Sequence, residues 1–367
     1  MVFIDLARAI AAIFMLYGHA LDALLAPEYR TGAWHDAWQF QRGLTSYLFL
    51  LLSGFAFSIA TARHWPAQLT LSPALGRRAR RFGLFLLLGY ALHLPMAPAR
   101  AMLDAPPETW RAFFAVDVLQ VIGVTFIGVQ LLVFVLRRRA AVTLAALLLA
   151  VIVPLATPFA WQVDWTAPLP DLLAAYLSPA TGSLFPLLPW SAFILLGIAL
   201  GQLYAVWGAS HLGGFANRAL LLPGLVLVLV WLALTASVGT HVGDGPFNYV
   251  PGQVLLRAGV CLLILSAVAH ISPYLGRLPH LVGALAQETL VVYVVHVCIV
   301  YGSLWNPGLA RWFGGRLTPL PMLVVIVLLI VSMTALASWW NRWKHMHPRR
   351  VRAVVLAIGA LMLLRLL

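Results

Sequence analysis

The sequence predicts an all-α fold, a polytopic transmembrane helical bundle of about eleven spans with a cytoplasmic N-terminus. Composition is the first observation, because 62% of the 367 residues are hydrophobic and only 10% are charged. A soluble chain of this length carries about a quarter charged residues. Long continuous apolar runs are the second, whereas a β-barrel shows short alternating segments. The third is the way in which basic residues alternate between the connections.

The apolar runs fill most of the chain, and each is close to the roughly 20 residues that cross the hydrocarbon core as a helix. They lie near 3–25, 44–62, 82–97, 112–136, 140–159, 185–207, 219–238, 253–272, 284–303, 319–339 and 352–367. So little chain lies outside them that we expect one domain over 1–367. The first run lacks a basic flank and contains Arg8, His19 and Asp22, so we expect a retained helix rather than a cleaved signal peptide.

The connections sort by charge. One set holds fifteen Lys and Arg and no acidic residue, and it lies near 62–81, 137–139, 208–218, 273–283 and 340–352. The alternate set holds six Arg and seven acidic residues, and it lies near 26–43, 97–111, 160–184, 239–252 and 304–318. Basic residues in short loops mark the cytoplasmic side, which places the N-terminus inside and the C-terminus outside. The net charge of +13 is then mainly a basic face against the lipid bilayer, and no nucleic-acid partner is expected.

One basic cluster is denser than orientation requires. Arg77, Arg78, Arg80 and Arg81 lie in RRARRF at the start of the third expected span. Arginine presents planar paired donors that suit phosphate. Orientation and attraction to anionic headgroups are the alternative explanation. The cluster is therefore a candidate phosphate site.

Ionisable residues inside the expected spans are costly and usually functional. They are Asp5, Arg8, His19, Asp22, His93, Asp117, Arg257, His270, Glu288 and His296. Three of these, Asp5, His93 and His270, lie near span ends, where their side chains can extend to water, so their presence needs no functional explanation.

The first span carries the most suggestive pattern. Arg8 and His19 are eleven residues apart, which puts them on one helical face with a rise of roughly 16 Å. Asp22 follows His19 by three residues and can meet it on that face. A carboxylate beside an imidazole fixes its tautomer and raises its basicity, as a general base requires. The alternative is a histidine satisfied between helices.

The connection that follows combines His35, Asp36 and Arg42 with Trp34 and Trp38. Tryptophans at the membrane interface are ordinary, and the histidine and arginine could equally be solvated loop residues. Taken alone, this segment is weak evidence for a site.

Asp117 and Gln120 lie about two turns inside the fourth span, and pairing of Asp117 with Arg257 would be a structural explanation. His296 lies near mid-membrane with Tyr293 one turn away, and nothing in the sequence independently marks it as catalytic. We find no nucleotide-binding loop, zinc motif or Gly-x-Ser-x-Gly elbow, and we expect no metal.

Several segments resemble the transmembrane acyltransferases. The stretch from Arg8 to His19 resembles the Arg–ten residues–His motif of the acyltransferase-three proteins, and RRARR resembles their cytoplasmic Arg-x-x-Arg motif. The closer resemblance is to bacterial relatives of the heparan-α-glucosaminide N-acetyltransferase catalytic domain. It rests on FIDLARAIAAIFMLYGHA, WHDAWQFQRGLTSYLFLLLSGFAFS, DVLQVIGVTF, LFPLLPWSAFILLGIALGQLY and ETLVVYVVHV, in the same order.

This resemblance implies acetyl transfer from cytosolic acetyl-CoA to a carbohydrate or other small acceptor reached from the other side. It also implies a multi-pass protein of the bacterial inner membrane. The family's catalytic histidine falls on His35, while His19 stands where the lysosomal enzyme has an asparagine. Either histidine, or both, is therefore expected to act as the base.

A working scheme assigns the remaining residues. CoA phosphates would bind the arginine cluster and Arg8, and Asp22 or Asp36 would orient the base. Asp117, Gln120 and Arg42 would position the acceptor or stabilise the oxyanion. Direct transfer and an acetyl-histidine intermediate both remain open.

The alternative is a transporter or flippase for an amphipathic or sugar-linked molecule, which also explains charges within the membrane. That alternative gives RRARR no special role. A homodimer is compatible with the sequence, but small-residue segments such as GIALGQ are too common here to identify its face.

Overall fold

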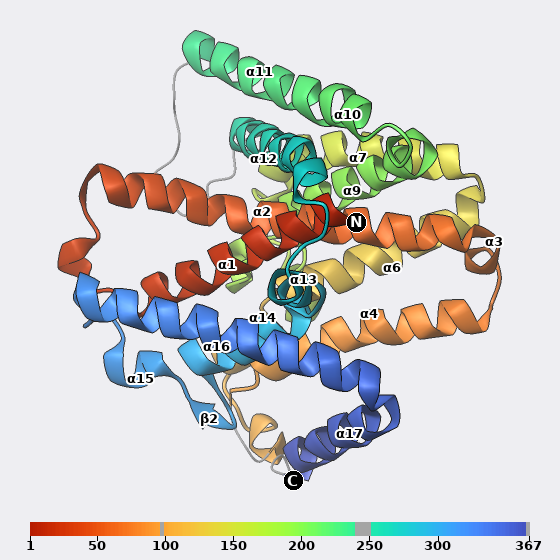
Figure 1. The fold of residues 1–367 in the computed structure, drawn as a ribbon. Helices are drawn as coiled ribbons and strands as arrows, with labels where there is room; N and C mark the ends of the chain where they lie inside the picture. The colour runs from red at the N-terminus through yellow and green to blue at the C-terminus, as the bar shows by residue number, and fades with distance from the viewer. Residues whose placement is uncertain (96–98, 239–250, 365–367) are drawn as a thin grey trace. The chain divides into compact units, whose positions relative to one another are not determined.

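The computed structural model describes residues 1–95, 99–238 and 251–364, and the chain within them is almost entirely helical (Figure 1). The helices of the first half are α1 Val2–Leu24, η1 Pro27–Tyr29, α2 Gly32–Arg63, α3 Trp65–Gln68, α4 Pro73–Leu92, η2 Ala99–Met102, α5 Pro107–Phe114, α6 Val118–Leu136, α7 Arg139–Ala160, α8 Asp171–Ala174 and η3 Pro179–Thr181. Those of the second half are α9 Leu187–Leu203, η4 Tyr204–Gly208, α10 Leu212–Phe215, η5 Ala216–Leu221, α11 Leu222–Val238, α12 Pro251–Ile271, η6 Ser272–Leu275, α13 His280–Gln287, α14 Thr289–Val300, α15 Leu309–Phe313, α16 Pro319–Met346 and α17 Pro348–Leu364. A small hairpin pairs β1 Gly302–Ser303 with β2 Asn306–Pro307.

The chain divides into two compact units. Unit 1 contains 1–45, 92–113 and 272–367, and unit 2 contains 46–91 and 114–271. The boundaries fall at 45/46, 91/92, 113/114 and 271/272, so the chain changes unit four times. Action of 1–367 as a single domain stays a prediction.

The predicted membrane bundle is confirmed. Among the described residues, eight helices are long and apolar enough to cross a bilayer, and α13 with α14 makes a ninth if this pair, bent by 79°, counts as one span. The other two of the eleven expected spans fall on α4, whose first half carries the arginine cluster, and on α17, which has only 17 residues. Eleven is therefore an approximate count. The expected connection near 239–252 and the end of the last span, 365–367, lie almost wholly outside the described residues.

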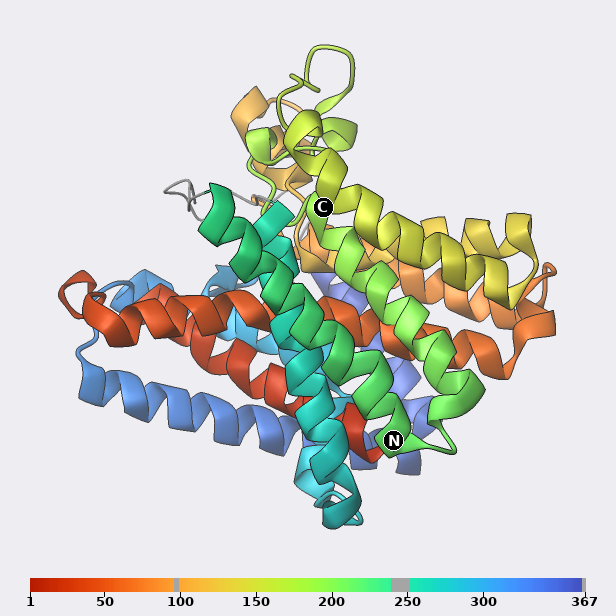
Figure 2. The same cartoon turned by 90° about the horizontal axis from the view of Figure 1, so that it is seen from above.

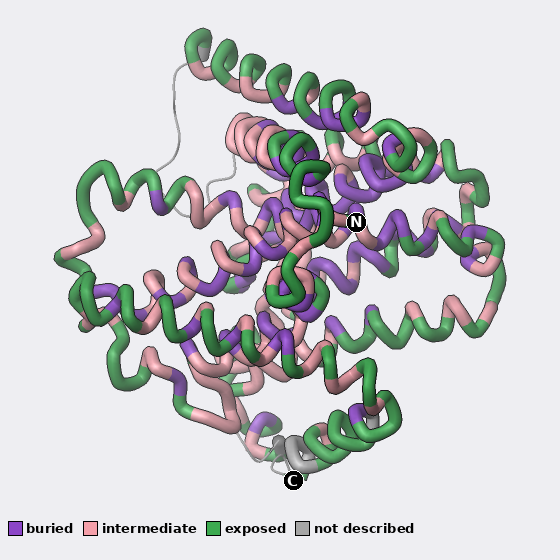
Figure 3. Tube along the Cα trace, in the orientation of Figure 1, coloured by how far each residue is buried: buried purple, intermediate pink, exposed green. Residues whose placement is uncertain are grey.

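Apolar side chains cover the outward faces of several long helices. Leu148 on α7, Leu229 on α11 and Val327 on α16 are 53%, 61% and 50% exposed, and green stretches mark such faces in Figure 3. A protein in water rarely exposes contiguous apolar surface on this scale. Hydrocarbon is the solvent that suits such faces, and the chain is an integral multi-pass membrane protein.

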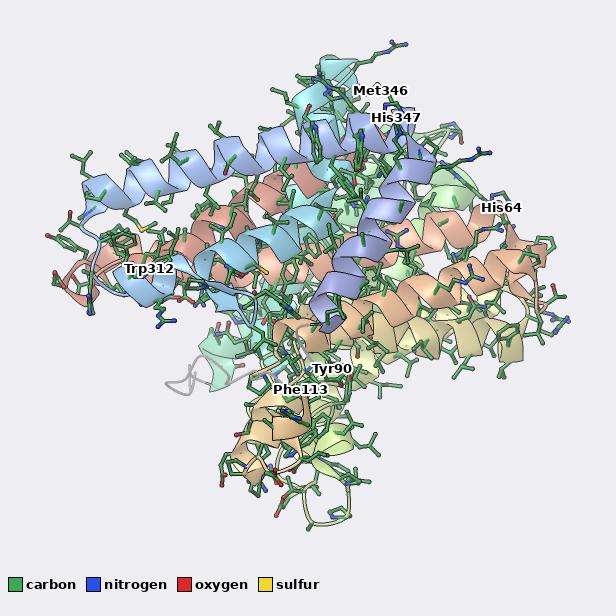
Figure 4. The ribbon with its side chains drawn as sticks, turned by 90° about the horizontal axis from the view of Figure 1, so that it is seen from below. His64, Tyr90, Phe113, Trp312, Met346 and His347 are labelled. Carbon is green, nitrogen blue, oxygen red and sulfur yellow. The ribbon has the colours of Figure 1, made fainter. Side chains whose placement is uncertain are left out.

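Unit 1 is organised around α1, which packs against α13, α14 and α16 (Figure 1). Ala7, Ala11 and Ala12 on α1 are fully buried. Such small residues let helix backbones approach closely within a membrane. Met346 and His347 mark the turn at which α16 ends and α17 begins (Figure 4).

Unit 2 contains the second part of α2, α3, nearly all of α4 and the helices from α6 to α12. The pairs α7–α9 and α11–α12 run side by side when seen from above (Figure 2). Two glycines bring α2 and α9 into backbone contact, since a Cβ at Gly54 would lie 2.0 Å from Ile194 O and one at Gly197 would lie 2.0 Å from Leu51 O. Only glycine permits this approach.

The expected loop near 26–43 is the main error in the predicted secondary structure. Helix α2 begins at Gly32, which has a φ of +80°, so His35 and Arg42 lie on a helix. The segment 33–42 contains no glycine or proline and has several good helix formers. Trp38, in its middle, is 8% exposed, so packing of one face adds to this propensity.

Candidate functional site

Helix α1 carries Arg8, His19 and Asp22 without a break, as the spacing predicted. The end of α1 is held by Arg30, whose guanidinium donates to the carbonyl oxygens of Leu25, at 2.7 and 3.0 Å, and Asp22, at 2.9 Å. A cation is favourable at this end because the last carbonyls of a helix lack internal partners. His19 and Asp22 therefore lie on an anchored turn.

Asp22 and Arg42 are brought together by the structure. Arg42 Nη2 donates to Asp22 Oδ2 at 2.8 Å, and the two side chains are 37% and 30% exposed. Tyr301 Oη donates to the same carboxylate oxygen at 3.4 Å. The Asp22 carboxylate is thus neutralised by an arginine that the sequence had assigned to the acceptor.

The imidazole of His19 meets a second histidine. His19 Nδ1 lies 2.8 Å from His296 Nε2, and the ring planes are nearly parallel, with centroids 5.0 Å apart and an interplanar angle of 14°. His296 is 0% exposed, whereas His19 is half-buried. The ring partner of His19 is therefore His296 on α14, and the carboxylate of Asp22 contacts Arg42.

Tyr301 contacts both the ring and the backbone of His19. Its ring lies 5.7 Å from that of His19 in an edge-on arrangement, and its hydroxyl also donates to His19 O at 3.4 Å. The hairpin that follows is tight, because a Cβ on Gly308 would lie 2.1 Å from Gly302 N. Gly302 itself has a φ of +90°, which favours glycine. The turn thereby fixes the chain directly after Tyr301.

His35, the second candidate base, lies in the first turns of α2. Its ring stands between Trp34 and Trp38, with centroids at 5.8 and 5.3 Å. His35 Nδ1 is 4.0 Å from Asp36 Oδ1, a contact weakened by the 83% exposure of Asp36. Within the described residues no hydrogen bond joins His35 to His19.

Asp117 and Gln120 form the capping box of α6 in unit 2. Asp117 Oδ1 accepts from Val118 N at 2.6 Å, and Gln120 Oε1 accepts from Asp117 N at 3.3 Å. Gln120 is 0% exposed, and its Nε2 donates to Ala115 O at 3.5 Å. Both side chains therefore start a helix, and their roles in catalysis and acceptor binding stay predictions.

The four clustered arginines on α4 differ in environment. Arg77, Arg80 and Arg81 are exposed, whereas Arg78 is half-buried. The Arg78 guanidinium stacks on the Phe57 ring at 4.5 Å and donates to Thr61 Oγ1 at 2.7 Å, Gln68 Oε1 at 3.0 Å, Gln130 Oε1 at 3.3 Å and Phe57 O at 3.5 Å. Burial and then the charge of Arg81 lower the pKa of Arg78 to about 10, which leaves it charged at neutral pH. Arg78 is thereby a structural cation, and the three exposed arginines are the ones open to an anion.

No group of three or more His, Cys, Asp or Glu side chains is placed to hold a metal ion in the described parts of the chain. Arg8 lies half-buried on α1, eleven residues before His19. Of the predicted site residues, unit 1 thus brings His19, Asp22 and Arg42 into one group. His296 and Tyr301 join them, and sequence reasoning assigned no role to either.

The sequence matches the family described as heparan-alpha-glucosaminide N-acetyltransferase, catalytic, over residues 1–235. The match covers 235 of 367 residues, which is more than half of the chain. It includes every predicted site residue, whereas His296 and Tyr301 lie beyond it. A search of curated proteins finds no match.

Proposed function

Because the chain belongs to the heparan-alpha-glucosaminide N-acetyltransferase catalytic family, we propose that this membrane acetyltransferase uses acetyl-CoA as its donor. Its acceptor is a hydroxyl or amine, of a sugar in the first instance, reached from the outer side of a bacterial inner membrane. The observation that carries this proposal is the group of His19, Asp22 and Arg42, in which Tyr301 contacts both the half-buried imidazole and the carboxylate–guanidinium pair. Such a group can remove a proton and hold a polar acceptor.

The base is His19 in this proposal. His19 has a buried ring partner at 2.8 Å, and a base whose orientation is fixed loses less entropy in the transition state. His35 remains the alternative base, and its two flanking tryptophan rings also suit contact with the apolar face of a sugar. Asp22, or Asp36 for His35, stays the proposed carboxylate neighbour.

The donor's phosphates would bind Arg77, Arg80 and Arg81. These arginines are exposed on α4, and guanidinium groups suit phosphate. Arg8 stays a candidate for the same ligand. Arg78 would stabilise the helix that carries this site rather than bind phosphate, because its guanidinium already donates to oxygens of Gln68 and Thr61.

The test uses the protein reconstituted in vesicles, with acetyl-CoA labelled in the acetyl group and a panel of amino sugars and neutral sugars. We expect labelled acetyl-sugar to form in wild-type vesicles and to be lost in His19→Ala. His35→Ala is the matched variant, and loss in it alone would move the base to His35. Sugar that crosses the membrane unacetylated, with no dependence on acetyl-CoA, would replace the proposal with a transporter.

A further inference from the structure

We infer that His296 is a positioning residue that holds His19 in the tautomer with its lone pair on Nε2. The inference rests on the proposed function, and it selects His19 rather than His35 as the base. His296 lies outside the family match, and its position 277 residues after His19 gave no sign of the contact.

The buried end of the hydrogen-bond chain is a backbone carbonyl. His296 Nδ1 lies 2.8 Å from Val292 O, the carbonyl four residues earlier on α14. A carbonyl oxygen can only accept, so His296 Nδ1 carries a proton. His296 is 0% exposed, and a charged imidazole without a carboxylate partner would be costly there. His296 is therefore neutral, and its Nε2 is an acceptor.

The next bond follows from the first. His19 Nδ1 lies 2.8 Å from His296 Nε2, which is within the usual range for a nitrogen donor. Since His296 Nε2 accepts, His19 Nδ1 donates and carries the proton. Neutral His19 then has its lone pair on Nε2. Two consecutive hydrogen bonds thus set both tautomers from a backbone carbonyl.

Exposure separates the roles of the two rings. His19 is half-buried and His296 has no exposed surface, so only His19 can meet a substrate. The ring of Tyr301, 5.7 Å from that of His19, and the ring of Tyr293, 5.7 Å from that of His296, further restrict the pair. His296 therefore acts through His19, in the way that the carboxylate of a catalytic triad acts through its histidine.

The proton can be followed through the reaction. The acceptor's O–H or N–H proton moves to His19 Nε2 as its electron pair forms a bond to the acetyl carbonyl carbon. The resulting His19 cation keeps its Nδ1–H bond to His296 Nε2, which is neutral and can accept it. The carbon–sulfur bond then breaks, and the CoA thiolate takes the proton from His19 Nε2. The products are the acetylated acceptor and CoA thiol, and His19 is neutral again.

The test combines nitrogen NMR with kinetics on the full-length protein in nanodiscs. Histidine labelled with ¹⁵N reports which ring nitrogen carries the proton, and His19→Ala identifies the His19 signals. We expect His19 and His296 both to be protonated on Nδ1. His296→Leu should release the His19 tautomer and lower kcat by about 10²–10³-fold with little change in KM.

Two variants separate positioning from packing. His296→Gln keeps a carbonyl oxygen that can accept from His19 Nδ1, so we expect it to preserve the His19 tautomer and to recover kcat to within about tenfold of wild type. His345→Leu is the control, because His345 Nδ1 makes the same kind of bond to Asn341 O, at 2.6 Å, on an exposed part of α16. We expect that variant to keep the kcat of wild type.

Protonation of His19 on Nε2 in the wild-type protein would overturn the inference. A His296→Leu protein with normal kcat and normal melting temperature would do the same. Protonation on Nδ1 in a protein that releases no thiol from acetyl-CoA would overturn the proposed function and leave the hydrogen-bond assignment intact.

Discussion

Arg42 Nη2 lies 2.8 Å from Asp22 Oδ2, and this contact ties the start of α2 to the last turn of α1. The same carboxylate accepts from Tyr301, which follows α14. One acidic side chain thus connects three segments of unit 1 around His19. The Asp22 side chain thus holds Arg42 and Tyr301 against α1.

This contact should be measurable as a coupling free energy. In a double-mutant cycle with Asp22→Asn and Arg42→Gln, we expect a coupling of about 0.5–1 kcal/mol, because both side chains are about one-third exposed. Unfolding of the four proteins in mixed detergent micelles provides the measurement. Purely additive losses would show that the pair contributes no interaction of its own.

Arg78 should matter for stability. Arg78→Met removes donors to Thr61, Gln68 and Gln130 and leaves buried acceptors unpaired, so we expect a loss of about 2–4 kcal/mol in the free energy of unfolding. Arg77→Met, one residue away and exposed, is the matched control and should change stability by less than about 0.5 kcal/mol. Equal stabilities of the two variants would contradict the structural role of Arg78.

The exposed arginines should matter for the donor. Replacing Arg77, Arg80 and Arg81 together by Gln should raise KM for acetyl-CoA by about tenfold or more, with a smaller effect on kcat, because phosphate contacts far from the thioester mainly supply uniform binding. Initial rates over a range of acetyl-CoA concentrations measure this. An unchanged KM in the triple variant would remove α4 from the donor site.

Two substitutions of Asp117 distinguish its role as a helix cap from a role in catalysis. Asn caps helices as well as Asp does, so Asp117→Asn should keep the stability of wild type, whereas Asp117→Ala should lose about 1 kcal/mol. Thermal unfolding of the two variants tests the capping role, and Asp117→Ala as stable as wild type would contradict it. A fall in kcat of Asp117→Asn at unchanged stability would support the catalytic role predicted from the sequence.

The fold was largely predictable because hydrocarbon imposes a simple rule on sequence. Helices must satisfy their own backbone groups, so apolar runs such as those of α7 and α16 mark the spans directly. The extension of α2 to Gly32 was missed because its first turns mix polar and aromatic residues, which resemble an interfacial loop. The bend between α13 and α14 was likewise missed, because the expected span near 284–303 treated the polar residues Gln287 and Glu288 at the break as part of one helix.

The candidate site was predictable only where its members share one helix. The spacing of Arg8, His19 and Asp22 predicted that they lie on one helix, α1. The Asp117–Gln120 capping box also has a local signature, because Gln120 stands at the third position after the capping residue. The contact of His19 with His296 depends on how α1 packs against α14, and no local pattern encodes that packing. A histidine inside the apolar run of α14 was its only signal.

The proposed function makes His19 the base for acetyl transfer from acetyl-CoA. The most direct measurement is the rate of CoA thiol release by purified protein with saturating acetyl-CoA and acceptor, compared between wild type and His19→Ala at matched folded fraction. We expect turnover in wild type and a fall of at least about 10²-fold in the variant. Equal rates of thiol release, or none in the wild-type protein with any acceptor, would contradict it.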